Sequence, residues 1–301
     1  MRPKEVWPLL KQTVSEWVDD NVPALAAALA YYTLFSIAPL LIIAIAVAGL
    51  VFGQEAAHGA IQAQLRGLIG EPGATVVQDM VASASKPESG VLATLVGLAV
   101  LAFAATGVFV QLQDALNAIW KAPRRQMSGL LSFLRQRLLS FAMVLGIGFL
   151  LLVSLVVSAG LAAAGTFLVG LLPAWEALLQ AVNVGISFAV ITLLFAMIYK
   201  VLPDTRVAWS DVWIGAAVTS LLFGLGKLGI GLYLGKSSVA SAYGAAGSFA
   251  VLLLWVYYSS QLLFLGAEFT QVYARWHGSR RAERGKAQPA AGPPTDDRSG
   301  G

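Results

Sequence analysis

Residues 24–52 read ALAAALAYYTLFSIAPLLIIAIAVAGLVF, and this nearly unbroken apolar stretch decides the fold class. A helix needs about 20 mainly apolar residues to cross the roughly 30 Å hydrocarbon core of a bilayer. Five more such stretches follow, and they lack the alternation of apolar and polar residues that marks membrane barrel strands. They lie at about 91–112, 138–161, 178–199, 212–234 and 248–272. The sequence therefore predicts an all-α, polytopic membrane bundle of six transmembrane helices.

The composition of the chain favours lipid over water as its surroundings. Of the 301 residues, 57% are hydrophobic and 12% are charged, whereas soluble domains carry about 25% charged residues. So few polar residues would not cover the surface of a soluble protein of this size. The first residues lack a short apolar core followed by a small-residue cleavage site, so we expect no removable signal peptide.

The distribution of basic residues predicts the orientation of the bundle. Sixteen of the 20 Lys and Arg residues lie before the first stretch, after the last, or in the second and fourth connections. Three lie in the first and fifth connections, and Lys227 lies inside the fifth stretch. Because cytoplasmic segments carry the excess of Lys and Arg, both termini are predicted to be cytoplasmic.

Residues 1–23 precede the first apolar stretch and are predicted to form a separate helix. Large apolar side chains recur here at helical spacing: Trp7, Leu10, Val14 and Trp17. Such an amphipathic helix lies in the plane of a membrane surface. We therefore predict an interfacial helix on the cytoplasmic side, with the Trp side chains as anchors.

The six stretches form one predicted transmembrane domain, residues 24–273, which contains one long connection and precedes a tail. The connection, residues 54–90, is the longest external one and predicts two short helices. These helices either cap a cavity or pack as a lid with no role in transport. The tail, residues 274–301, is basic and rich in Pro and Gly, so we expect it to be disordered and to touch anionic lipid.

The first apolar stretch contains a proline, which is costly in a membrane helix. We expect a kink or a break between Ser36 and Pro39, beside the hydroxyl groups of Tyr31 and Tyr32. A break would turn freed backbone carbonyls toward a cavity. The alternative is a tilted, kinked helix whose hydroxyls bond to neighbouring helices.

Lys227 is the basic residue that lies deepest in a predicted crossing. It lies about 15 residues into the fifth stretch, which at 1.5 Å per residue is roughly 22 Å from the cytoplasmic face. Its ammonium group either extends to the outer interface or lines a polar cavity for an anionic headgroup. Glycines around it leave room for close approach of helices: Gly224, Gly226, Gly229, Gly231 and Gly235.

Charged residues gather near the predicted cytoplasmic ends of the helices. They are Asp114, Lys200, Arg206, Asp211 and Glu268. We expect an inner-face ionic network, in which pairing is the commoner role, although acids inside membranes also relay protons. The difference in depth argues against a direct bond between Glu268 and Lys227.

The side-chain inventory disfavours an enzyme. The chain has no Cys, and its two histidines, His58 and His277, lie far apart in sequence. No phosphate-binding loop, HExxH motif or carboxylate pair with acid/base spacing occurs. We therefore predict no catalytic residue, no metal ligand, no cofactor and no nucleic-acid partner.

Four segments in order resemble the YihY/BrkB family of bacterial inner-membrane proteins. They are AAALAYYTLFSIAPLL (26–41), DALNAIW (114–120), YKVLPDTRVAWSDVWIGA (199–216) and YGAAGSFAVLLLWVYYSSQLLFLGAEF (243–269). The resemblance extends over about residues 7–276. It implies a six-helix fold in the inner membrane.

The resemblance also implies functions and functional positions. Family members have been called serum-resistance virulence factors, carried an older label as tRNA-processing ribonucleases, and are discussed as movers of lipids or lipid-linked envelope components. Motif matches add Tyr243, Gly247 and Ser248 to the candidate substrate path, and Asn117 and Pro203 to the inner-face group.

The leading functional hypothesis is a transporter or lipid-handling protein with a polar cavity near the kink in the first stretch. Its partners would be membrane lipids, including an anionic lipid or a lipid-linked substrate. The rival hypothesis is a scaffold of the envelope that transports nothing. A ribonuclease is the third, because the older family label names one, but a metal nuclease needs clustered ligands that this chain lacks.

Overall fold

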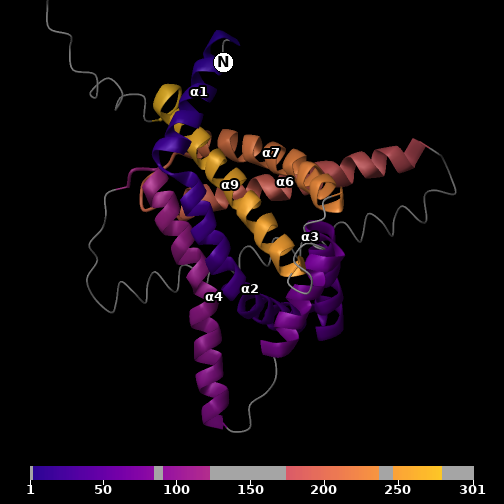
Figure 1. Cartoon of the computed structure of the whole chain (residues 1–301). Helices are drawn as coiled ribbons and strands as arrows, with labels where there is room; N and C mark the ends of the chain where they lie inside the picture. Colours follow the sequence, from indigo (N-terminus) through magenta and orange to yellow (C-terminus); the bar gives the residue numbers. More distant parts are fainter. Residues whose placement is uncertain (1–2, 85–90, 123–173, 237–246, 280–301) are drawn as a thin grey trace, which may run out of the picture.

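The computed structural model of the protein describes residues 3–84, 91–122, 174–236 and 247–279. These ranges contain seven helices and no strand (Figure 1). The helices are α1 (Pro3–Asp19), α2 (Val22–Phe52), α3 (Gln54–Ala84), α4 (Val91–Ile119), α6 (Ala174–Val201), α7 (Trp209–Lys236) and α9 (Gly247–Trp276). The prediction of an all-α fold is confirmed.

Four of the predicted crossings coincide with described helices that are long and apolar enough to span a bilayer. They are Val22–Ala46, Gln180–Val201, Trp209–Lys227 and Phe249–Trp276. Within these segments only 22% to 39% of the apolar windows are buried inside the protein. The remaining apolar surface faces outward, where lipid covers it without penalty. The second predicted crossing coincides with α4, and the third, residues 138–161, lies outside the described residues.

Helix α2 follows α1 after a sharp turn at Asn21. Asn21 adopts a left-handed conformation with φ 51° and ψ 44°, which Asn tolerates better than most residues. Helix α2 then runs unbroken from Val22 to Phe52 with Pro39 inside it. Of the two outcomes expected between Ser36 and Pro39, a kink or a break, the break is therefore absent, because the helix continues through the proline.

Element α3 folds back on itself instead of forming one straight rod (Figure 1). Ile61 and Leu65 from its first half line the same cavity as Val77 and Val81 from its second half. In a straight helix, residues 61 and 81 would lie roughly 30 Å apart. The two halves pack against α2, as two short helices predicted for residues 54–90 would.

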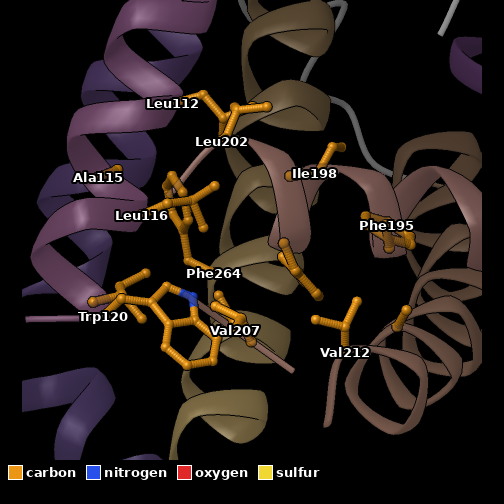
Figure 2. Packing of buried hydrophobic residues seen from close by; sticks show 14 of the residues in the cluster. Leu112, Ala115, Leu116, Trp120, Phe195, Ile198, Leu202, Val207, Val212 and Phe264 are labelled. Carbon is orange, nitrogen blue, oxygen red and sulfur yellow. The ribbon is translucent and has the colours of Figure 1, made fainter. Parts of the chain in front are cut away.

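A buried apolar cluster joins α4, α6, α7 and α9. Figure 2 shows side chains of α4, α6 and the α6–α7 connection gathered around Phe264 of α9. Leu116 and Trp120 enter from α4 and the turn after it, and Tyr199 from α6, and each is almost completely buried. Ala26 and Leu29 of α2 also belong to the cluster. The cluster therefore packs together residues from all four segments that carry the family resemblance.

Helix α1 packs antiparallel along the end of α9. Trp276 Nε1 donates to Gln12 Oε1 at 2.6 Å, and Leu9 packs in a small cluster with Phe269 and Val272 of α9. The start of α1 and the end of α9 therefore lie at the same end of the bundle (Figure 1).

Candidate functional site

A cavity of about 340 Å³ lies between the second half of α2 and the two halves of α3. Its apolar wall comes from both elements: Leu41, Ile45, Ile61, Leu65, Val77, Val81 and Ala82. Ligand pockets in proteins have volumes of about 300–1,000 Å³. The cavity therefore has room for a small molecule or for part of a larger one.

Three polar side chains join the apolar wall of this cavity: His58, Gln62 and Gln78. The Nε2 donor of Gln78 is buried and has no hydrogen-bond partner among the described residues. A buried donor left without a partner costs about 1–3 kcal/mol. The cavity therefore offers a polar group to an acceptor inside an otherwise apolar space.

The polar groups near Pro39 face α4 and the exterior, not this cavity. Ser36 Oγ donates to the backbone oxygen of Ala104 in α4 at 2.6 Å. Tyr31 and Tyr32 are exposed, with ring centroids 5.9 Å apart. Pro39 is buried within α2. The cavity begins with Leu41, just beyond this proline, and lies on the side of α2 that meets α3.

Lys227 lies in a separate place, in a crevice between α7 and α9. The crevice is lined by Phe223, Trp255, Tyr258, Ser259 and Leu262 and has no room for a water molecule. Lys227 itself is exposed and does not line the α2–α3 cavity. Gly247 begins α9 and is buried, Ser248 follows it in the same helix, and Tyr243 lies outside the described residues.

The predicted inner-face residues fall into three separate groups. The first group is built around hydrogen bonds between Asn117 and Asp204. Asn117 Nδ2 donates to Asp204 Oδ2 at 2.8 Å, and its Oδ1 accepts from the Asp204 backbone N–H at 2.7 Å. These two bonds tie the end of α4 to the α6–α7 connection, in which Pro203 is buried. Asp114 lies on the same surface. Partial burial of its carboxyl, and then the negative charge of Asp204, raise the pKa of Asp114.

The second group surrounds the α6–α7 connection and the start of α7. Lys200 Nζ donates to the backbone oxygen of Val207 and lies 5.5 Å from the centroid of the Trp209 ring. Arg206 is exposed in the same connection. Asp211 is buried and accepts from the backbone N–H of Ser279 at 3.0 Å and from its hydroxyl at 2.7 Å. Asp211 therefore fastens the chain after α9 to the start of α7.

Glu268 belongs to the third group, the carboxylate cluster, which also contains Glu16 and Asp20. One oxygen of each residue lies within 4.8 Å of the other two. Lys121 pairs with Asp20 and lies 3.7 Å from Glu16 Oε2. Arg275 Nη2 pairs with Glu16 Oε1 at 3.0 Å. The cluster therefore joins α1, the turn after α4, and α9.

The carboxylate cluster is poorly suited to a divalent metal. Mg²⁺ and Ca²⁺ take about six or more oxygen ligands. Lys121 and Arg275 already contact oxygens of Glu16 and Asp20. The oxygens left over come from only two side chains.

Sequence reasoning missed several of these partners. Glu16, Asp20 and Lys121 were not expected around Glu268, and Asp204 was not expected opposite Asn117. One available signal was the four-residue spacing of Glu16 and Asp20, which places them on one face of a helix. No sequence pattern pairs residues of α1 with residues more than 240 positions later.

A bundle of long apolar helices with lipid-facing sides and buried acids defines a helical, multi-pass membrane protein. The chain belongs to the virulence factor BrkB family, whose model matches residues 13–291. The family membership predicted from four motifs is thus confirmed.

Curated relatives of the chain are named membrane proteins. A UPF0761 membrane protein of Rhodospirillum centenum is 31% identical over 289 residues, which cover 92% of this chain and 60% of that protein. Another, from Cronobacter sakazakii, is 30% identical over 301 residues, which cover 93% of this chain and 94% of that protein. The chain thus spans less than two thirds of the first relative and nearly all of the second. No solved structure matches the chain.

Proposed function

We propose that this protein binds a lipid-like, amphipathic molecule in the α2–α3 cavity and moves or presents it within the bacterial inner membrane. The cavity is the observation that carries this proposal. Its wall is mainly apolar, as an acyl chain requires, and Gln78 offers an unpaired donor to a polar group of the ligand.

The position of the cavity supports access from the bilayer. One wall belongs to α2, whose segment Val22–Ala46 is long and apolar enough to span a membrane. A lipid tail could therefore enter from the surrounding hydrocarbon, while its headgroup stays near His58 and Gln62.

The test is lipid movement in liposomes that contain the purified full-length protein. Labelled phospholipid is followed by the accessibility of its headgroup to a reagent that does not cross membranes. Val81→Phe fills the cavity, so we expect it to slow movement several-fold. Ala63→Phe is the matched control, because Ala63 is exposed on α3 and does not line the cavity.

A rate equal to that of empty vesicles, in protein whose thermal unfolding is normal, would overturn the proposal. A scaffold role would then be favoured by stable partners in crosslinking. Lys227→Ala should leave the rate unchanged, since Lys227 does not line the cavity. We propose no catalytic activity, and metal-supplemented protein is expected to leave structured RNA intact.

A further inference from the structure

We propose that the carboxylate cluster binds one proton, shared between Glu268 and Asp20, and that this proton fastens α1 to α9. The inference does not depend on lipid movement. It rests on the geometry, burial and charge of five side chains.

Glu268 is the centre of the proposed site. It is 0% exposed, and neither of its side-chain oxygens has a hydrogen-bond partner among the described residues. Oδ2 of Asp20 is likewise buried without a partner in this part of the chain. A buried carboxylate without a partner is strongly destabilising.

The two carboxyl groups are placed to satisfy each other. One carboxyl oxygen of Asp20 lies within 4.8 Å of one carboxyl oxygen of Glu268, and both residues have buried oxygens without a partner among the described residues. Two ionised carboxylates offer only acceptors, whereas one proton supplies the missing donor. Carboxyl pairs at such distances share a proton because both cannot ionise together.

The charge of the cluster points to a single bound positive charge. Three carboxylates face two cations, Lys121 and Arg275, which leaves one negative charge in a buried place. One proton neutralises this excess. A divalent cation would instead leave an excess positive charge and would lack ligands.

Among the described residues, the other helices that pack against α9 bring no further charge to Glu268. Asp114, the charged residue of α4, is exposed and lies near Asp204 instead. Helix α2 contains no charged side chain, and α3 packs against Leu252 and Val256, in the first half of α9. Asp211 of α7 is bound to Ser279, and the Tyr199 hydroxyl of α6 donates to the backbone oxygen of Leu263 at 2.7 Å. The facing charges are therefore those of Glu16, Asp20, Lys121 and Arg275.

The experiment is infrared spectroscopy of the full-length protein in nanodiscs at neutral pH. The carbonyl stretch of a protonated carboxylic acid should be present in the wild type and absent from Glu268→Gln. Asp20→Asn should also remove it, because the amide donates to Glu268 and removes the excess charge. Asp19→Asn is the matched control: Asp19 is the exposed neighbour of Asp20, outside the cluster, and its substitution should leave the band intact.

Two variants keep the test decisive if one of them does not fold. Loss of the band in either folded variant supports the proposal. Absence of the band from the wild type, or its persistence in a folded Glu268→Gln protein, overturns the proposal. A third result would also overturn the proposal: the band is absent, and added Na⁺ or Mg²⁺, but not choline, raises the unfolding temperature. That result would show that a metal cation, not a proton, occupies the cluster.

Discussion

Gly215 of α7 lies directly against Thr270 of α9, so closely that a Cβ on Gly215 would fall 2.7 Å from the Thr270 Cβ. A second glycine–threonine contact lies one helical turn away, with the glycine on α9 and the threonine on α7. A Cβ on Gly266 of α9 would fall 2.8 Å from the Cβ of Thr219 and 2.6 Å from the Tyr199 hydroxyl. The two helices are therefore antiparallel, and each offers a glycine to the other's threonine.

Gly215→Ala should destabilise the protein. Such short distances are essentially never seen for real Cβ atoms, so α7 and α9 must move apart. Overpacking of this kind costs about 1–3 kcal/mol. Thermal unfolding in detergent, followed by circular dichroism, measures the loss. Gly224→Ala is the control on the same helix, since a Cβ there meets nothing within 4 Å; an equal loss in both variants would contradict close packing as the cause.

Asn117→Ala should detach the α6–α7 connection from the end of α4. The change removes both bonds to Asp204 and should lower stability by about 1–3 kcal/mol, as expected for hydrogen bonds to a charged group. Asp204→Ala should lower it less, because it removes only the carboxylate acceptor, while the backbone N–H of residue 204 can still donate to Asn117 Oδ1. The double variant should be little worse than Asn117→Ala alone, because that change already removes both bonds; full additivity would show that the pair is not coupled.

Asp114→Asn should change the pH dependence of stability. The pKa of Asp114 is raised in the folded state. Its carboxyl therefore stabilises the fold when protonated at low pH, and this contribution is lost as the pH rises through the pKa of the folded state. Asp114→Asn should therefore flatten the fall in stability with rising pH in the acidic range. The effect stays below about 1 kcal/mol because the residue is exposed and its charge is screened. Unfolding temperatures across that range measure it; unchanged curves would contradict the assignment.

Introduced cysteines should report the predicted orientation, because the natural chain has none. Lys11→Cys on α1 and Ala63→Cys on α3 are both at exposed positions. In intact inner-membrane spheroplasts, a maleimide that does not cross membranes should label position 63 and should label position 11 only after permeabilisation. Labelling of both from outside would contradict cytoplasmic placement of α1.

The exposed apolar face of α1 should bind to the membrane surface. Trp7 is 76% exposed, and Leu10 and Val14 are also uncovered, while Leu9 is buried against α9. Replacing Trp7, Leu10 and Val14 by Ser should make α1 more accessible to protease in liposomes. Asp19→Ser, at an exposed position on another side of α1, serves as a single-substitution control. Unchanged cleavage of the triple variant would argue against interfacial contact.

Much of the fold was predictable because lipid imposes a simple rule on sequence. Every backbone polar group in a membrane-crossing segment must form its hydrogen bonds within the protein. Long apolar runs such as Val22–Ala46 can therefore be recognised as helices from the sequence. Pro39 was harder to interpret. A proline removes one hydrogen bond locally, and neighbouring helices decide whether the helix tolerates that loss.

The candidate sites were less predictable because they depend on how distant helices meet. Hydropathy identified Glu268 and Lys227 as charged residues that are costly to place in a membrane. No local sequence pattern reveals that Asp20 lies near Glu268, or that Lys227 lies away from the α2–α3 cavity. The α2–α3 cavity depends on α3 folding back, which places Ile61 near Val81. Such shapes arise from tertiary packing, which composition and periodicity do not encode.

The pairing of α1 with α9 also has a consequence for biosynthesis. Gln12 leaves the ribosome 264 residues before its partner Trp276. At a translation rate of about 5–20 residues per second, roughly 13 to 53 seconds pass between the synthesis of Gln12 and that of Trp276. During that interval the contact face of α1 is open to insertase, chaperone or lipid. Assembly of this end of the bundle is therefore a late event, completed only when the last described helix has been inserted.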